Sequence, residues 1–512
     1  MIPILTDSIF IFPHIIKVQF LFLEVILVLN IHFSSSIFKY CIYNTTINDL
    51  LSLNRCNMAT AKLSSFLIYN PTYGPKEGQE HLKVLFYYPE SEHPDVKINK
   101  VGLCEALIQF AKTYSPSKPC ETLHTQKHKQ VFYEAEENFW FVMTVSNPWK
   151  ETMRDGKPVR EYFEENIRSV VLKSVLEQAY FMFKLFMGTI ENIVANEDIE
   201  HLKNKLQDFY LKYLPDINIH HCDILNVHNG IDYFPLQKST YLKIQSFINS
   251  IKSNFPSIQH VMALYADKLI WSDLQKTDSR YLYSYLVNKL LPTSSEFENS
   301  VISNYLTRDG SYGRFLAGVR YYEHSTDRHT TTVYITSTSM KGEKLFMVTY
   351  QVLNISMTLL FEGETPPSVD TFRKLDSFMG KALIDLSTEM EVVPMKNSYD
   401  SNDTAYKYIY FNQESLLVKS SCHYRDNNGF MKCSMSKDVM RVVLTMCQEF
   451  LSKTSEVEVI TKASMDYWIV GKKTEQHECY IVVNRKDANL IDVNDDVRKI
   501  CANNITNISL AE

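Results

Sequence analysis

The chain has 512 residues, of which 45% are hydrophobic and 22% are charged, a composition typical of globular proteins with packed cores. Its formal net charge of −6 provides no basic surface for nucleic acid and no strongly acidic tail. The length predicts roughly three domains. The chain contains only 14 Gly residues, so we do not expect its function to depend on a glycine-rich phosphate-binding loop.

The first 57 residues differ in composition from the rest, because they contain neither Ala nor Gly. Residues 18–33 form an apolar run, but Gln19 and Glu24 interrupt it, and it falls short of the ~20 apolar residues that span a bilayer. We therefore expect a non-native or disordered N-terminal extension at 1–57, with the true start at Met58. A real but dispensable tail and a membrane anchor are the alternatives.

Beyond Met58, alternating apolar residues predict strands, and apolar residues three and four apart predict helices. The first unit reads as strand, strand, helix, two strands and two helices, at 64–69, 82–88, 99–113, 130–133, 139–145, 161–187 and 197–213. Asn196 is the predicted N-cap of the last of these helices.

The same order of elements recurs twice along the chain. In the second unit the predicted elements lie at 261–265, 268–271, 280–291 (helix), 332–336, 344–353, 356–361 and 368–390 (helix). In the third they lie at 406–411, 416–420, 437–452 (helix), 467–472, 479–483 and 495–504 (helix, capped by Asn494). The repeat predicts an α/β protein of three modules, with borders at 58–215, 216–395 and 396–512.

No Walker loop, G-x-G-x-x-G, G-x-S-x-G or H-E-x-x-H motif is present. The ten cysteines include no C-x-x-C pair, so neither a zinc ribbon nor a thiol redox site is predicted. His124 and His128 are four residues apart but fall in a predicted loop, and His220, His221 and Cys222 are too close in sequence to share one ion on a strand. We expect no cofactor, no metal and no covalent catalysis.

Two polar segments of the first unit suit protein recognition. The turn at 73–78 is rich in Gly and Pro, and residues 115–127 form a basic, proline-restrained loop after the predicted helix. An ordinary surface loop is the alternative at both places.

These segments also carry a resemblance to a known family. FLIYNPTYGPKEGQE, VGLCEALIQFAKTYSPSKPCETLHTQK, EENFWFVM, KASMDYWIVGKK and DANLIDVNDDVRKICA are similar to stretches of the Ccz-one family of vacuolar fusion proteins, and the similarity covers about residues 63–509. The resemblance implies a chain of three longin modules, each with a central antiparallel or mixed five-stranded sheet flanked by helices.

The resemblance further implies one subunit of a heterodimeric guanine-nucleotide exchange factor. Its partner would be a Mon-one-type tri-longin protein, and its target the late-endosomal, Rab-seven-type GTPase in endosome maturation, autophagosome–lysosome fusion and vacuole or lysosome fusion. A third, propeller-containing regulatory subunit is a possible addition. The family is cytoplasmic and is recruited peripherally to endosomal and lysosomal membranes by an early-endosomal Rab and phosphatidylinositol 3-phosphate. A longin-type tethering or adaptor protein without exchange activity is the alternative.

In the resembled family the first longin modules of both partners pair and form the GTPase-binding face. The matching positions give interface candidates at the helix start and in the loop after it: Asn99, Lys100, Val101, Gly102, Leu103, Ser117, Lys118, Pro119, His124 and Thr125. Phe139, Phe141 and Met143 are candidates for edge-strand pairing with the partner. Helix capping or loop geometry is the alternative role for the candidates of the helix and the loop.

Overall fold

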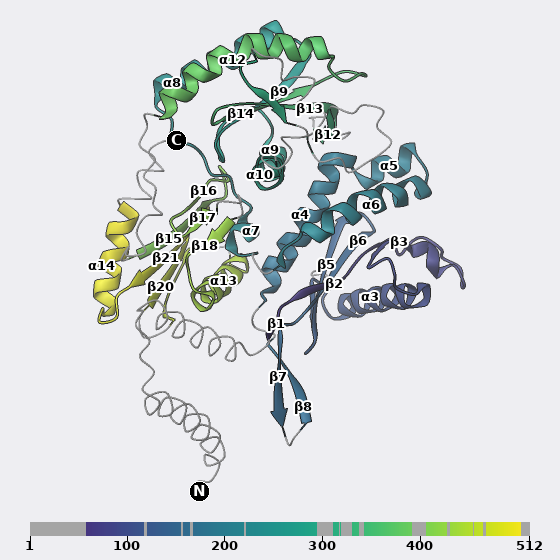
Figure 1. Ribbon diagram of the computed structural model, residues 1–512. Coiled ribbons are helices and arrows are strands. Elements are labelled where there is room, and N and C mark those ends of the chain that lie inside the picture. Colours follow the sequence, from purple (N-terminus) through teal and green to yellow (C-terminus); the bar gives the residue numbers. More distant parts are fainter. Residues whose placement is uncertain are drawn as a thin grey trace, which may run out of the picture. The chain divides into compact units, whose positions relative to one another are not determined.

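The computed structural model (Figure 1) describes residues 58–116, 120–154, 157–163, 167–219, 222–293, 311–316, 318, 330–336, 343–391, 406–426, 431–453, 455–463 and 467–502. These residues divide into two compact units: a small one containing Trp149–Glu161, and a large one containing Thr60–Pro148 and the described residues from Tyr162 onward. The predicted extension at 1–57 lies outside the described residues. Among the residues that are described, no helix is long and apolar enough to cross a membrane.

The large unit contains three sheets built on one plan. In the first module the strands are β2 (Lys62–Tyr69), β3 (Val84–Tyr88), β4 (Thr122–His124), β5 (His128–Glu136) and β6 (Phe139–Ser146). In the second they are β9 (Ile258–Tyr265), β10 (Lys268–Ser272), β11 (Arg314–Leu316), β12 (Thr331–Ile335), β13 (Glu343–Val352) and β14 (Ile355–Phe361). In the third they are β15 (Tyr406–Asn412), β16 (Val418–Ser420), β19 (Val457–Lys462), β20 (Tyr467–Lys473) and β21 (His477–Asn484).

All three sheets place the last strand of the module beside the first. The spatial orders are β3-β2-β6-β5-β4, β10-β9-β14-β13-β11 with β12 also on β13, and β16-β15-β21-β20-β19. Neighbouring strands are antiparallel throughout these sheets. The chain reaches the centre of the sheet last, so the final strand has a neighbour on both sides and is buried on both faces.

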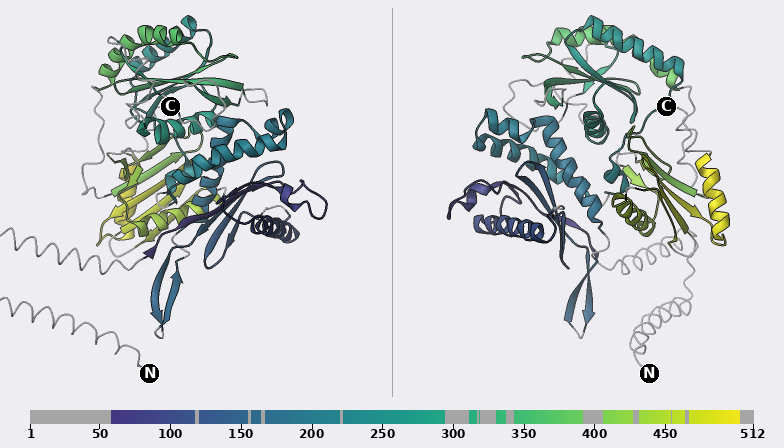
Figure 2. Two further views of the ribbon diagram at one scale, coloured as in Figure 1. Left: turned by 45° about the vertical axis from the view of Figure 1, so that its right-hand side comes forward. Right: turned by 180° about the vertical axis from the view of Figure 1, so that it is seen from behind.

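Helices cover both faces of the first sheet (Figure 2). The helix α3 (Pro94–Tyr114) packs through Val101, Cys104 and Ile108 on one face. The other face is covered by α4 (Ser169–Met187) and α6 (Ile199–Tyr213), which follow one another along the chain with α5 (Ile190–Asn196) between them. Each face is therefore sealed by helices of its own module.

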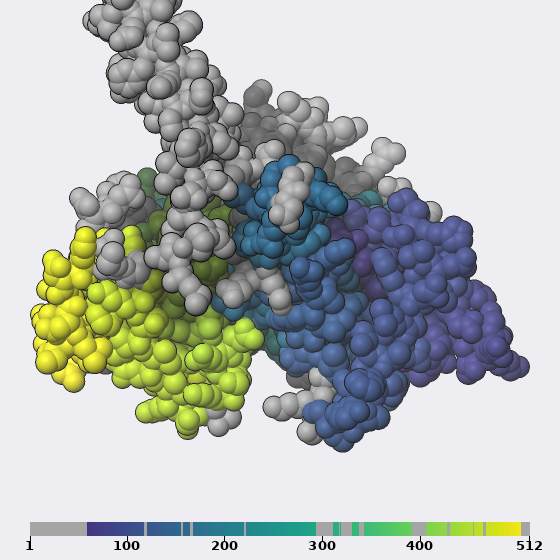
Figure 3. Space-filling model, turned by 90° about the horizontal axis from the view of Figure 1, so that it is seen from below, coloured from purple at the N-terminus to yellow at the C-terminus, as the bar shows by residue number. Residues whose placement is uncertain are grey.

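The second and third sheets are also covered on two sides. In the second module α8 (Lys238–Asn254) and α12 (Val369–Glu391) cover one face, while α9 (Lys276–Tyr285) and its continuation η5 (Leu286–Leu290) pack on the other. In the third module α14 (Leu490–Ile500) covers one face and α13 (Lys437–Leu451) the other. Figure 3 shows α14, in yellow, at the surface of the third module.

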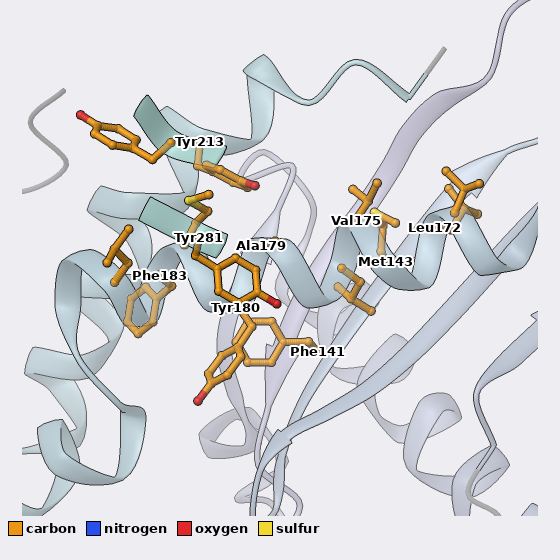
Figure 4. Close-up of a cluster of buried hydrophobic side chains, with 14 of the residues drawn as sticks. Phe141, Met143, Leu172, Val175, Ala179, Tyr180, Phe183, Tyr213 and Tyr281 are labelled. Carbon is orange, nitrogen blue, oxygen red and sulfur yellow. The ribbon is translucent and has the colours of Figure 1, made fainter. Parts of the chain in front are cut away.

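One continuous apolar cluster joins the inner helices of the three modules. We call it the central cluster; it contains Leu172, Val175, Ala179 and Phe183 of α4, Tyr281 and Leu282 of α9, and Val443 and Cys447 of α13. Figure 4 shows its α4 side chains beside Phe141 and Met143 of the first sheet. The ring of Phe181 stacks on Tyr281 with 4.3 Å between ring centroids, which fixes α4 against α9.

The small unit is a separate three-stranded sheet in the order β1-β7-β8. Its strands are β1 (Met58–Ala59), β7 (Trp149–Arg154) and β8 (Lys157–Tyr162), and the guanidinium of Arg160 lies over the ring of Trp149 at 4.2 Å. The long helix predicted at 161–187 is therefore wrong at its start. Residues up to Tyr162 pair in β8, and α4 begins only at Ser169.

Two other helix boundaries differ from the sequence prediction because another side chain caps the helix. Asp198, not Asn196, accepts a hydrogen bond from the His201 backbone N–H at the start of α6. The last helix begins at Leu490, where Asn489 and Asp492 form a capping box, and not at Asn494. Elsewhere the predicted strands and helices of the three modules are present with ends shifted by a few residues.

A short helix, α7 (Ile224–His228), packs against the third module through its last residue, the buried His228. The imidazole of His228 stacks on Phe411 with 4.3 Å between ring centroids, and its Nε2 lies 3.5 Å from a carboxylate oxygen of Glu478. Burial, with Arg280 and Lys473 nearby, lowers the pKa of His228 to about 3. Burial also raises the pKa of Glu478. His228 is therefore neutral at neutral pH, and the pair is not an ion pair.

The central cluster gives a first prediction. Leu172 is fully buried, so Leu172→Ala leaves a cavity and should lower the free energy of unfolding by about 2–5 kcal/mol. Leu242→Ala, at a half-exposed position of α8, should change it by less than about 0.5 kcal/mol. Urea denaturation of both variants is the measurement. Equal losses would show that α4 is not the core helix.

The buried imidazole gives a second prediction. Between its ordinary pKa and about 3, the unfolded chain binds a proton on His228 that the folded chain does not, so stability falls as the pH drops below about 6.5. The wild type should lose about 2 kcal/mol more than His228→Phe between about pH 7 and about pH 5, since Phe keeps the stacking without titrating. Denaturation midpoints at both pH values test this. The exposed control His81→Gln should follow the wild type, and coincident slopes for wild type and His228→Phe would contradict the prediction.

Candidate interaction face on the first module

The helix α3 begins and ends where its sequence requires. The His93 side chain accepts a hydrogen bond from the Asp95 backbone N–H at 3.3 Å, and Pro94 occupies the first helical position, where its missing N–H costs nothing. The helix ends at Tyr114, two residues before Pro116, which cannot continue it. The result is a 21-residue helix along one face of the first sheet.

The inward side of α3 is apolar and closely packed. Val101, Cys104 and Ile108 lie one turn apart and contact the sheet beside Leu67 and Trp140. Burial raises the pKa of the Cys104 thiol to about 12, so this thiol stays protonated and packs as a small apolar side chain. The inward side thus accounts for the stability of the helix.

The outward side of α3 is also apolar, although nothing in the described chain covers it. Val96, Leu103, Phe110 and Tyr114 are 37%, 57%, 63% and 77% exposed. Spacings of seven, seven and four residues place them in one line along the helix. We call these four residues the α3 stripe. The rings of Phe110 and Tyr114 contact each other with 5.0 Å between centroids.

Three lysines of α3 lie over aromatic rings of the sheet beneath the helix. Lys100 donates a hydrogen bond from Nζ to the Tyr87 hydroxyl at 2.6 Å and lies over the Tyr87 ring. The ammonium of Lys97 lies over the same ring at 5.5 Å, and that of Lys112 lies over Trp140 at 5.9 Å. These lysines help to hold α3 on the sheet, while the exposed apolar line on its other side is typical of a protein-binding surface.

Of the five predicted interface residues of α3, three are exposed, Lys100 is partly buried against Tyr87, and Val101 is buried. Asn99, Gly102 and Leu103 are exposed. Val101 is only 1% exposed because it faces the sheet, so its prediction as a contact residue is wrong. An added methyl group at Gly102 would meet no other atom within 4 Å, so the fold itself does not require glycine there.

The candidates after the helix have structural partners where they are described. His124 Nε2 lies 2.9 Å from the Ser169 hydroxyl, which ties β4 to the start of α4. Thr125 closes the β4–β5 turn, donating from its hydroxyl to the His128 carbonyl and accepting from the His128 N–H. Ser117, Lys118 and Pro119 lie outside the described residues.

The prediction of edge pairing through β6 is wrong. This strand is hydrogen-bonded to β2 on one side and β5 on the other, so it has no open edge. Phe139, Phe141 and Met143 are buried in the central cluster. The two edge strands of the sheet are β3 and β4, and a partner strand could pair only there.

Sequence reasoning missed Val96, Phe110 and Tyr114. Their seven- and four-residue spacing was visible in the sequence as a second apolar line, offset from the line through Val101. One sheet face cannot bury the apolar surface of a helix that has two apolar lines. The second line was therefore the sequence signal for an exposed apolar surface on this helix.

Comparison with known proteins agrees with this architecture. Residues 63–188 match the family described as the first longin domain of INTU, CCZ1 and HPS4, while residues 258–380 and 402–500 match Intu longin-like domains 2 and 3. The vacuolar fusion protein CCZ1 homolog of Xenopus tropicalis is 39% identical over 454 residues, which are 87% of this chain and 96% of that protein. The chain belongs to the CCZ1 family of vacuolar fusion proteins.

CCZ1 homologs of other organisms match a similar share of the chain. That of Danio rerio is 38% identical over 459 residues, covering 88% of this chain and 96% of its own. That of Dictyostelium discoideum is 29% identical over 444 residues, covering 85% and 95%. The predicted fold of three longin-like modules is confirmed, and the three matched ranges fall inside the predicted module borders.

The two sides of α3 give a third prediction. Val101→Asp places a carboxylate in a closed apolar core and should destabilise the chain by several kcal/mol. Leu103→Asp, two residues away on the exposed side, should change stability by less than about 0.5 kcal/mol. Thermal unfolding followed by circular dichroism separates them. A larger loss for Leu103→Asp would mean that the stripe is packed against the chain itself.

Proposed function

We propose that this chain is one subunit of a heterodimeric guanine-nucleotide exchange factor for a late-endosomal, Rab-seven-type GTPase, with a Mon-one-type tri-longin protein as partner. Membership of a family of vacuolar fusion proteins supports a role in vacuole-fusion trafficking. The α3 stripe supports the subunit assignment, because an exposed apolar line of this length on a single chain is typical of a surface covered by another protein.

Exchange activity would need no covalent chemistry from this chain. An exchange factor accelerates nucleotide release by binding the nucleotide-free GTPase more tightly than the loaded one. The work consists of holding a switch segment away from the phosphates and Mg²⁺. A rigid face made from two longin modules, one from each subunit, supplies such a surface.

The stripe is the part of that face that we assign to partner contact. Leu103 and Phe110 lie at its centre, and their exposed side chains would be buried on association. Asn99 and Lys100, four and three residues before Leu103, place polar groups beside it on the helix. If the partner also pairs a strand, it does so at β3 or β4 and not at β6.

The active complex would promote endosome maturation, autophagosome–lysosome fusion and vacuole or lysosome fusion. Its recruitment from the cytoplasm to endosomal and lysosomal membranes would depend on an early-endosomal Rab and phosphatidylinositol 3-phosphate. A propeller-containing regulatory subunit is a possible third component. The competing function is a tether or adaptor that uses the same stripe without exchange activity.

The fourth prediction tests the exchange function directly. The purified heterodimer should accelerate the release of fluorescent GDP from the Rab-seven-type GTPase. In the double variant Leu103→Asp/Phe110→Asp, the new charges oppose burial of the stripe, and the release rate should fall at least about tenfold. Stopped-flow fluorescence gives the rates, and co-purification gives the amount of heterodimer.

Ile491→Asp is the matched control, since Ile491 is 72% exposed on α14 of the third module. It should leave the release rate within about twofold of the wild type. A wild-type heterodimer that forms but does not accelerate release would refute exchange activity and favour the tether. A double variant with wild-type rate and assembly would refute the role of α3.

A further inference from the structure

The third module carries a small ribbon that is not part of its sheet. Strands β17 (His423–Arg425) and β18 (Met431–Cys433) pair antiparallel, between β16 and α13 in chain order. The register places His423 directly opposite Cys433, and Cys422 precedes His423. The ribbon therefore brings the Cys433 thiol to the adjacent Cys422 and His423, which precede it by eleven and ten residues.

The three donor atoms are close enough to bind one ion. One ligand atom each from Cys422, His423 and Cys433 lies within 4.8 Å of the other two, and Cys422 Sγ is 3.3 Å from His423 Nδ1. Tetrahedral zinc, with Zn–S near 2.3 Å and Zn–N near 2.0–2.1 Å, would separate sulfur from nitrogen by about 3.6 Å and the two sulfurs by about 3.8 Å. The Cys422 Sγ–His423 Nδ1 distance of 3.3 Å is close to the first of these values, and the Cys433 sulfur lies within 4.8 Å of both atoms.

Surrounding groups orient the donors as metal ligands are oriented. Asp223 Oδ2 lies 2.8 Å from His423 Nε2, so the carboxylate accepts the Nε2–H and Nδ1 is the ring nitrogen that faces the Cys422 sulfur. The backbone N–H of Met435 donates to Cys433 Sγ at 3.4 Å and orients this sulfur. The Ser420 hydroxyl lies 2.6 Å from Nδ1 and 3.1 Å from Cys422 Sγ, where a fourth ligand would be.

Burial of the cluster also matches a structural site. Cys422 and His423 are 1% and 4% exposed, while Cys433 is partly open to solvent. An ion would enter from solvent beside Cys433 and would then be bound by the buried side chains of Cys422 and His423. Two thiolates with one imidazole are the donor set that selects zinc over magnesium or calcium.

A second buried cluster, of His228, Cys447 and Glu478, has similar donor types but a different environment. The Lys473 ammonium lies 3.7 Å from Glu478 Oε1, and the Tyr480 hydroxyl donates to Oε2 at 2.9 Å. The carboxylate there already has a cation and a hydrogen-bond donor, so a divalent ion would be repelled by the lysine.

We propose that Cys422, Cys433 and His423 Nδ1 form a structural zinc site, with the Ser420 hydroxyl or a water as fourth ligand and Asp223 as the carboxylate that orients the histidine. Zinc replaces the proton on each thiol that is protonated, and the Nδ1 proton where the imidazole is charged, and these protons pass to solvent. Since Asp223 is the N-cap of α7, the site would fasten that helix to the third module.

The fifth prediction is measured on the full chain, purified with a reductant, incubated with Zn²⁺ and desalted. Elemental analysis should find about one more zinc ion per chain in the wild type than in Cys422→Ser/Cys433→Ser. Cys120→Ser, a partly buried thiol of the first module, is the matched control and should retain the wild-type content. Equal zinc in the wild type and the double variant would overturn the proposal.

A measurement on the wild type alone guards against a variant that fails to fold. Zinc should slow alkylation of Cys422 and Cys433 at least about tenfold, as followed by peptide mass spectrometry, and leave the rate at Cys120 unchanged. Titration with Co²⁺ should produce the thiolate-to-cobalt charge-transfer band. Alkylation rates that are equal with and without zinc, or cobalt spectra without that band, would overturn the site.

Discussion

The burial of α4 on all sides is the constraint on which the arrangement of the large unit depends. Thirteen of its 19 residues are buried, too many for a helix that covers one sheet face only. One side packs on β5 and β6 of its own module, while the opposite side meets α9 and α7. The three modules therefore share one core. Removing any one of the three inner helices would expose apolar side chains of the other modules to solvent.

The outer helices of the three modules, which lie outside this shared core, differ in how much apolar surface they expose. In the second and third modules, α8, α12 and α14 form separate apolar cores on the faces turned away from the central cluster. In the first module α3 does the same, but it carries a second apolar line that no described residue covers. The proposed partner contact follows from that difference, and a binding function fits a face better than a pocket.

The segment around α7 is short, but it contacts the second and third modules at several points. At its start Asp223 reaches His423, at its end His228 packs on Phe411, and the carbonyl of Asn229 accepts from Arg280 of α9. Beyond it Ile231 pairs with Leu417 and Tyr233 with Leu269. A connecting segment held at so many points behaves as part of the core, and the proposed zinc site would strengthen one of these attachments.

The sequence by itself determined the repeated order of strands and helices, the fold class and the family, since periodicity and local motifs are properties of neighbouring residues. It also located α3 as the helix of interest. Only the tertiary structure decided that β6 is central and which of the two apolar lines of α3 faces the sheet, because strand order and helix rotation depend on contacts between distant segments. The same reason explains why the sequence did not predict the cluster of Cys422, His423 and Cys433. Their spacing matches no metal-binding motif, and only the pairing of β17 with β18 brings the three side chains together.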